Sequence, residues 1–179
     1  MGTRSCDAEV SRVKLVEAGK GSRDLDDAAQ IWAEATAARD GSADVADLSI
    51  SRPVLEAVLE RSPSSFVLIA RDEDDSAAGF AAVEPAGATG AEVGYFGVRP
   101  GHWGQGVGAL LLRAVQERLS VSGYRTAQLL VYTDNVRAVA LYERLGWQPS
   151  GQPAPHPRTG KLEQRYMLTL ATAREQQRP

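Results

Sequence analysis

The sequence predicts a mixed α/β domain whose sheet is antiparallel in its first part and is flanked by helices. Short apolar runs joined by turns between residues 66 and 98 are typical of an antiparallel meander. Apolar residues then recur at helical spacing from Val107. The apolar run 129–131 follows and is typical of a strand buried on both faces. A chain of 179 residues fits one domain, which we place at 1–172, with a polar tail at 173–179.

The first elements are a short strand and a helix. Residues 12–16 alternate as a strand does. Apolar residues at helical spacing in 28–35 predict the helix, for which Ser22 or Asp24 is the candidate cap. Gly41 is expected to end it.

A second helix and three strands follow. We expect Ser51 to cap the helix, with Pro53 in its first turn. Residues 66–70, 78–83 and 92–98 are the predicted strands, separated by a charged turn and by a turn rich in proline and glycine.

The last part of the chain predicts two helices around the strand at 129–131. The first begins at Val107 and is closed by Gly123, and the second covers about 136–145. Residues 149–160 are rich in proline and glycine and predict a loop, whereas 164–170 predict a final strand.

Composition excludes several classes of partner. A net charge of −3 gives no electrostatic reason to expect nucleic acid, and it disfavours an anionic membrane surface. The single cysteine, Cys6, permits no intrachain disulfide and fits a reducing compartment. The sequence shows neither a signal-peptide pattern nor an apolar run long enough to cross a bilayer. We therefore expect a cytoplasmic protein.

A glycine-rich turn joins the strand ending at Val98 to the next helix. Its residues are Trp103, Gly104, Gln105, Gly106, Val107 and Gly108. Glycines let the backbone approach a ligand closely and adopt positive φ. The first amides of a helix lack internal partners and carry the positive end of the helix dipole. The turn therefore predicts a phosphate or pyrophosphate site, the alternative being a tight turn without a ligand.

Two other phosphate-binding patterns compete. The P-loop pattern fails because no Lys-Ser or Lys-Thr follows the glycines. The dinucleotide fingerprint is satisfied in its permissive form by residues 104–109, and Asp134 lies where a ribose-binding acid is expected. The preceding meander, the longer turn at 100–103 and the short chain after Tyr132 count against it.

A second motif extends from Asn135 to Trp147 and reads Asn-Val-Arg-Ala-Val-Ala-Leu-Tyr-Glu-Arg-Leu-Gly-Trp. It resembles the Asn-x-x-Ala-x-x-Leu-Tyr-x-x-x-Gly-Phe helix of the GNAT superfamily of acyl-CoA-dependent N-acetyltransferases. The pyrophosphate loop of that family, Gln/Arg-x-x-Gly-x-Gly/Ala, is matched at its end by 106–108, whereas Trp103 replaces Gln or Arg. The resemblance covers about residues 66–170.

The resemblance implies a mixed, mostly antiparallel, twisted sheet of about six to seven strands with about four helices. It also implies acetyl-CoA as the cofactor, transfer of its acetyl group to a primary amine by direct attack in a ternary complex, and favours a homodimer. The acceptor is an amine-bearing small molecule, peptide or protein. No His/Cys/Asp cluster with ligand spacing supports a metal.

The resemblance further implies that a strand splays from its neighbour beyond Val98. Pantetheine then lies like an added strand against main-chain groups of Phe96 and Val98. The expected cofactor-binding residues are Phe96, Gly97, Val98, Trp103, Gly104, Gln105, Gly106, Val107, Gly108, Asn135, Ala138 and Tyr142.

Four residues are candidates for proton transfer. Tyr142 is the expected general acid, since a phenol is protonated at neutral pH, and a core aromatic is the alternative. Glu92 is the candidate base and Glu84 is the reserve base. The alternative for each is a glutamate on a strand that is simply exposed to solvent. His156 is interpreted as a surface histidine. Asn135 fits both helix capping and a pantetheine contact.

The acceptor site is less well specified by the sequence. In the family it is shaped by the segments that correspond to 39–48 and 149–160. Asp40, Asp44 and Asp47 would attract a cationic amine, or they form a solvated loop. Two alternatives to an acetyltransferase stay open: a non-catalytic CoA-binding or regulatory module, and a dinucleotide-binding oxidoreductase.

Overall fold

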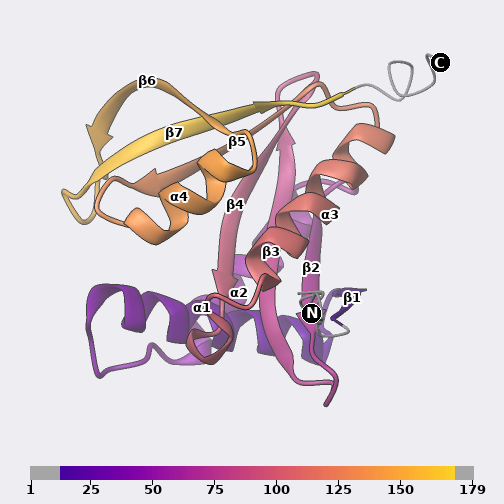
Figure 1. Cartoon of the computed structure of the whole chain (residues 1–179). Coiled ribbons are helices and arrows are strands. Elements are labelled where there is room, and N and C mark those ends of the chain that lie inside the picture. Colours follow the sequence, from indigo (N-terminus) through magenta and orange to yellow (C-terminus); the bar gives the residue numbers. More distant parts are fainter. Residues whose placement is uncertain (1–12, 172–179) are drawn as a thin grey trace, which may run out of the picture.

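The computed structural model describes residues 13–171, which form a seven-stranded mixed sheet with helices on both faces (Figure 1). In chain order the elements are β1 (Lys14–Glu17), α1 (Arg23–Asp40), α2 (Leu48–Arg61), β2 (Phe66–Arg71), β3 (Ala77–Ala86), β4 (Gly90–Val98), η1 (Pro100–His102), α3 (Val107–Val121), β5 (Thr126–Tyr132), α4 (Val136–Arg144), β6 (Gln148–Pro155) and β7 (Leu162–Thr169). The strand order is β1-β2-β3-β4-β5-β7-β6. Every neighbouring pair is antiparallel except β4–β5.

This architecture confirms the predicted fold class, because the described residues contain a mostly antiparallel sheet and four α-helices. Cys6, Arg12 and the predicted tail lie outside the described residues.

Two hydrophobic cores lie on opposite faces of the sheet. On one face, α1 and α2 pack side chains such as Ile31 and Leu55 against Phe80. On the other face, α3 and α4 cover side chains that include Leu111 and Trp147. Because successive strand residues point to opposite faces, β3 contributes to both cores and is buried along most of its length.

The expectation that the strand at 129–131 is buried on both faces is wrong. Leu129 and Val131 are buried, whereas Leu130 is 48% exposed. The reason is that α1 and α2 pack mainly on β2, β3 and β4. On this face of β5, α1 reaches Tyr132 through Arg39 and leaves Leu130 exposed.

The predicted loop at 149–160 is also wrong, because most of it forms β6. β6 is the last strand of the sheet and pairs only with β7, so a proline there need not break a second set of hydrogen bonds. Gly151, at φ 74°, lies within an irregularity of that pairing. Pro85 is likewise part of β3 rather than of a turn. A proline is tolerated there because Pro85 lies beyond the last residue pair between β2 and β3.

The start of the second helix differs from the prediction. Asp47 is the cap, and its side chain accepts a hydrogen bond from the amide of Ser49 at 2.8 Å. Ser51 lies inside the helix, where its hydroxyl is buried and donates to the carbonyl of Ala29 at 3.2 Å. Pro53 consequently lies past the first turn. For α1, Ser22, one of the two candidate caps, occupies the N-cap position but makes no side-chain capping hydrogen bond, and the expected end at Gly41 is confirmed.

Close packing of α3 on β3 depends on Gly79. A Cβ at this position would lie 2.9 Å from a methyl group of Leu111 and 3.1 Å from a methyl group of Val107. Such contacts are shorter than side chains tolerate, so a glycine allows α3 to lie this close to the sheet. The same contact holds the beginning of α3 beside the end of β4.

We therefore expect Gly79→Ala to lower the free energy of unfolding by about 1–3 kcal/mol, because α3 must move away from β3. Gly94→Ala is the matched control within the sheet, since a Cβ there meets nothing within 4 Å and no positive φ is involved. Urea unfolding of both variants measures the difference. Equal stability of the two variants would contradict the packing role of Gly79.

Candidate functional site

β4 and β5, the parallel pair, diverge soon after they start. Their paired residues begin at Gly90 and Thr126 and end at Glu92 and Gln128. β4 then continues to Val98 without a partner on this side. The divergence therefore begins earlier than the position beyond Val98 that the family resemblance implies. We call residues 93–98, on the side toward β5, the unpaired β4 edge.

Main-chain groups of Phe96 and Val98 point toward this unpaired β4 edge. The amide of Arg99 donates to the carbonyl of Ala78 in β3 at 2.8 Å. Because main-chain directions alternate along a strand, the groups of Val98 and Phe96 point away from β3. Gly94 is the extra residue in an irregularity of the β3–β4 pairing, and such bulges bend a strand. The bulge thus lies where the two strands separate.

Gly97 differs from its two neighbours. It is paired with Phe80 of β3, and a Cβ on it would lie 2.9 Å from the ring of Phe80. The main-chain groups of Gly97 therefore point to β3, and its α-carbon faces the core formed with α1. Gly97 thus differs from Phe96 and Val98, with which the family resemblance grouped it as a cofactor-binding residue.

The glycine-rich turn leads from η1 into α3 with unpaired amides. Gly104 and Gly106 have φ values of 80° and 86°, and a Cβ on either would meet nothing within 4 Å. No side chain caps the helix, and the first amide to bond back to the turn is that of Leu110, to the carbonyl of Gly106 at 3.0 Å. The amides of residues 107–109 therefore have no acceptor among the described residues. This arrangement suits an anion.

Gly108 brings the turn close to both neighbouring elements. A Cβ on it would lie 3.0 Å from Leu141 of α4 and 3.4 Å from Phe96 and Val98 of β4. The predicted loop residue Gln105 is held within the turn, because its side-chain amide donates to the carbonyl of Gly101 at 2.8 Å. The anion-binding amides and the unpaired β4 edge are thus adjacent.

Trp103 anchors the turn to β4. Its indole nitrogen donates to the carbonyl of Val98 at 2.7 Å. The guanidinium carbon of Arg137, from the first turn of α4, lies 4.1 Å from the centre of the indole ring. Sequence reasoning singled out Trp103 as a departure from the loop pattern but missed Arg137, because no local pattern indicates a contact between two distant turns.

Asn135 caps α4, as one of its two interpretations predicts. Its side-chain oxygen accepts a hydrogen bond from the amide of Ala138 at 3.3 Å. Its side-chain nitrogen has no partner among the described residues. The cap fixes where α4 begins and, with it, the position of Tyr142 two turns later.

Tyr142 packs among aromatic rings beside the unpaired β4 edge. Its ring centre lies 6.2 Å from that of Phe96, and Trp147 and Tyr166 lie at similar distances. The residue is 5% exposed, and its phenol oxygen has no hydrogen-bond partner among the described residues. Burial raises the pKa of Tyr142 above its ordinary value. The phenol therefore carries its proton at neutral pH, as a general acid must, and the raised pKa makes it a weaker acid than an exposed tyrosine.

The two candidate bases are cross-strand partners with different neighbours. Both oxygens of Glu84 accept from Arg61 of α2 at 2.8 Å, so an arginine already neutralises this carboxylate. Glu92 accepts from the side-chain amide of Gln128 at 2.6 Å. Sequence reasoning missed Gln128, because its contact depends on the register between β4 and β5.

Glu92 and Tyr142 lie on opposite faces of the sheet. The neighbours of Glu92 in β4, Ala91 and Val93, point into the core that contains Tyr142. Glu92 therefore points to the other face, where α2 contributes Arg61 to its cross-strand partner. A base and an acid could reach the end of the β4–β5 pairing from two sides.

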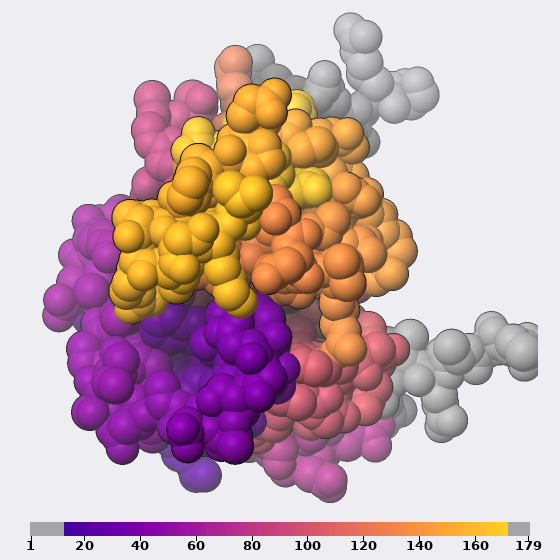
Figure 2. All heavy atoms as spheres, turned by 90° about the vertical axis from the view of Figure 1, so that its left-hand side faces the viewer, coloured from indigo at the N-terminus to yellow at the C-terminus, as the bar shows by residue number. Residues whose placement is uncertain are grey.

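Side chains from α1 and from the β6–β7 turn meet on the α1 side of β5. Asp40 pairs with Arg39 at 2.8 Å and with Lys161 at 3.0 Å, and Lys161 lies 3.7 Å from Asp134. Arg39 and Lys161 both lie over the ring of Tyr132. We call these five residues the charged rim. Figure 2 views this face, where gold atoms of β6 and β7 rest on the indigo and purple atoms of α1 and α2.

Asp47, Asp44 and His156, the other residues considered from the sequence, differ in their contacts. Asp47 caps α2, and the side chain of Asp44 has no partner among the described residues. His156 is part of an ordered turn between β6 and β7, where Nδ1 accepts from the amides of Arg158 and Thr159 at 3.3 and 3.2 Å. Its ring packs against Tyr132. His156, interpreted from the sequence as a surface histidine, is therefore half-buried and holds the β6–β7 turn together.

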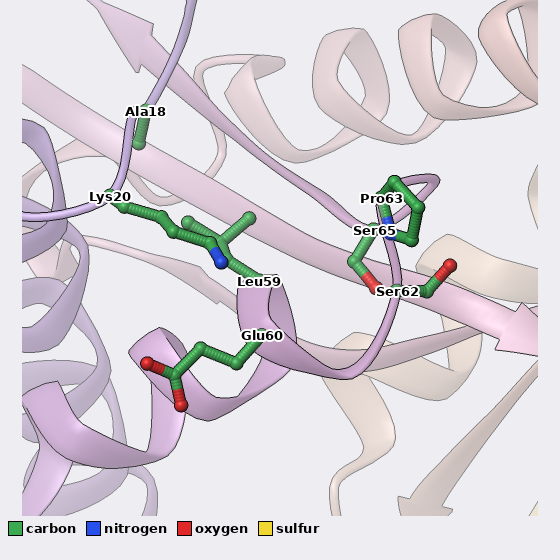
Figure 3. Close-up of a pocket in the computed structure, with 7 residues that line it drawn as sticks. All are labelled: Ala18, Lys20, Leu59, Glu60, Ser62, Pro63 and Ser65. Carbon is green, nitrogen blue, oxygen red and sulfur yellow. The ribbon is translucent and has the colours of Figure 1, made fainter.

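Two surface hollows are lined by neither Tyr142 nor the residues of the glycine-rich turn. The first is beside the end of α2 (Figure 3) and is lined by Ala18, Lys20, Leu59, Glu60, Ser62, Pro63 and Ser65. In the second, Arg71 pairs with Asp24 and, at 2.7 Å, with Asp27. Neither brings together the candidate acid and base. Within residues 13–171 no group of three or more His, Cys, Asp or Glu side chains could hold a metal, and no helix is long and apolar enough to span a membrane.

Comparison with known proteins relates this geometry to a family. The model of the acetyltransferase (GNAT) family matches residues 26–147, which include the glycine-rich turn and the motif from Asn135. A mycothiol acetyltransferase from Kineococcus radiotolerans is 33% identical over 127 residues, 69% of this chain and 39% of the relative. The chain spans between 18% and 39% of the length of the curated mycothiol acetyltransferases it matches.

Solved structures share the fold. The ribosomal-protein-S18-alanine N-acetyltransferase from Escherichia coli has a TM-score of 0.71 at 21% identity, over 90% of this chain and 96% of that one. The yncA protein from Salmonella typhimurium, whose structure contains its cofactor acetyl-CoA, has a TM-score of 0.67 at 20% identity, over 90% of this chain and 95% of that one. At this identity the likeness concerns the fold alone.

The charged rim predicts a pH-dependent contribution to stability. The hydrogen bond from Arg39, together with Lys161, lowers the pKa of Asp40 from 3.8 to about 2. The ionised carboxylate therefore stabilises the fold above pH 3.8, and this contribution is lost as the pH falls through about 2. Because the side chain is 34% exposed, we expect Asp40→Asn to cost less than about 1 kcal/mol at pH 7.

Urea unfolding at pH 7 and at lower pH measures this effect, with the exposed Asp44→Asn as the matched control. The difference between wild type and Asp40→Asn should shrink toward pH 2. A difference that stayed constant with pH would contradict the role of the carboxylate charge.

Proposed function

Because the chain belongs to the acetyltransferase (GNAT) family, we propose that it transfers the acetyl group of acetyl-CoA to a primary amine. The observation that carries this proposal is the divergence of β4 and β5 after Glu92, with Tyr142 beside the unpaired β4 edge. We further propose direct attack of the amine on the thioester in a ternary complex, since candidate base and acid lie on opposite faces of the sheet. A homodimer and a cytoplasmic location remain predictions.

The residues on the unpaired β4 edge and the glycine-rich turn fit coenzyme A. Main-chain groups of Phe96 and Val98 would pair with pantetheine, and the unpaired amides at 107–109 would bind pyrophosphate. The carbonyl of Val98 already accepts a hydrogen bond from Trp103, so the amide of Val98 is the main-chain group more available to pantetheine. The side-chain nitrogen of Asn135 is available for a carbonyl of pantetheine, because only its oxygen is used by the cap. Acetyl-CoA supplies the acyl thioester.

Two proton transfers balance the proposed reaction. A carbon–nitrogen bond forms and the carbon–sulfur bond breaks. Glu92 accepts the proton that the amine loses, directly or through a water, and Tyr142 gives a proton to the departing sulfur. The phenol of Tyr142, which is protonated at neutral pH and lies beside Phe96 of the unpaired β4 edge, supports the second role. The neutralised Glu84 leaves Glu92 as the favoured base.

We expect Tyr142→Phe to reduce turnover about 100-fold or more, because the departing sulfur loses its proton donor. Affinity for CoA should be retained, since the ring still packs on Phe96. Release of free thiol measures turnover, and calorimetry measures CoA affinity. Tyr124→Phe, half-buried and away from α4, is the matched control. Unchanged turnover in Tyr142→Phe would refute the acid role.

We expect Glu92→Gln to lower kcat about 10- to 100-fold, whereas Glu84→Gln changes it little. The two residues are cross-strand neighbours on one face, so the pair separates proton transfer from local structure. Steady-state rates with saturating acetyl-CoA, together with melting temperatures, make the comparison. A larger loss in Glu84→Gln would move the base role to that residue and away from Glu92.

The acceptor is an amine whose identity a screen must determine. The matched relatives carry the name mycothiol acetyltransferase, so we propose a mycothiol-related amine as the first candidate, ahead of peptide amino termini. A panel of amines with thiol detection tests this order. The absence of thiol release across the whole panel would favour a CoA-binding module without catalysis. A thermal shift with NAD(P) but none with CoA would favour a dinucleotide-binding protein.

A further inference from the structure

The glycine-rich turn lacks a side chain that could bind phosphate at the position of Trp103. An indole carries no charge, and its single donor is already used at the carbonyl of Val98, 2.7 Å away. In its place the indole ring lies beneath a guanidinium, that of Arg137, at 4.1 Å. Stacking of this kind orients a guanidinium without using any of its five donors.

Arg137 has no carboxylate partner among the described residues, and it is exposed. Three other basic residues, Arg61, Arg39 and Lys161, differ from Arg137 because each pairs with an acidic side chain. The positive charge of Arg137 is therefore not paired with a carboxylate in the part of the chain that the structure describes, and it lies on Trp103, the first residue of the glycine-rich turn that leads to the unpaired amides of α3. In Figure 2, orange atoms, the colour of α4, meet pink-red atoms, the colour of the turn and α3.

We propose that Arg137 binds a phosphate of the coenzyme A nucleotide and that Trp103 positions it. Arg137, in the first turn of α4, thus supplies the positive charge that the glycine-rich turn lacks. The indole ring of Trp103, which stands where the family has Gln or Arg, holds this guanidinium in place. This inference rests on the proposed use of acetyl-CoA. It assigns Trp103 a positioning role, and it links the two sequence motifs through one contact between side chains.

The test is calorimetric titration of CoA into the full chain. We expect Arg137→Ala to bind CoA about ten-fold more weakly, because a charge-assisted hydrogen bond is lost. Arg144→Ala is the matched control, as it removes the same charge from an exposed position at the other end of α4, and it should bind like wild type. Trp103→Leu should weaken binding too, and adding Arg137→Ala to it should then have less effect than in the wild type.

Titration with 3′-dephospho-CoA identifies the phosphate. If the effect of Arg137→Ala disappears with this ligand, Arg137 binds the 3′-phosphate; if it persists, Arg137 binds the pyrophosphate. Equal CoA affinity in Arg137→Ala and Arg144→Ala would overturn the inference while leaving the proposed function intact. A wild-type chain that does not bind CoA would overturn both.

Discussion

The divergence of β4 and β5 after the Glu92–Gln128 pair is the constraint on which the rest of the structure depends. A strand that loses its neighbour inside a sheet leaves main-chain donors and acceptors unpaired, which is costly unless something else pairs with them. Here a bulge at Gly94 bends β4 at the same place. The glycine-rich turn and α4 then border the unpaired β4 edge through Gly108 and Phe96. The sheet thus exposes main-chain atoms where an extended ligand could complete it.

Much of the fold could be predicted because its signals are local. Gly41 ends α1 by adopting a left-handed conformation, and Asn135 caps α4 with its own side chain. The failures concern residues whose role is set by distant neighbours. Ser51 resembles a cap in the sequence, but its side chain is buried inside α2 and donates a hydrogen bond to the carbonyl of Ala29 in α1. Prolines in β6 suggested a loop, yet an edge strand tolerates them. Leu130 looked buried, but the contacts of α1 and α2 are mainly with β2, β3 and β4, and Leu130 is left exposed.

The candidate site divides in the same way. The glycine-rich turn and the position of Tyr142 follow from spacing along the chain, so they were accessible from the sequence. The partners of these residues were not. The bond between Gln128 and Glu92 requires the register of two strands, and the stack of Arg137 on Trp103 requires two turns to meet. A motif therefore indicates which ligand a family binds better than it indicates how this chain binds it.

The charged rim differs in kind from the remainder of the site. Many of the proposed contacts to coenzyme A use main-chain atoms of β4 and of the start of α3, whose positions depend on the sheet as a whole. The charged rim consists of side chains at the ends of α1 and β5 and near the β6–β7 turn, joined by Asp40 and Lys161. Single substitutions can alter it without disturbing a strand or a core. Under the proposed function, the segments predicted to shape the acceptor site include Asp40 of this rim, so substitutions there could change the acceptor while the main-chain contacts to the acyl donor stay the same.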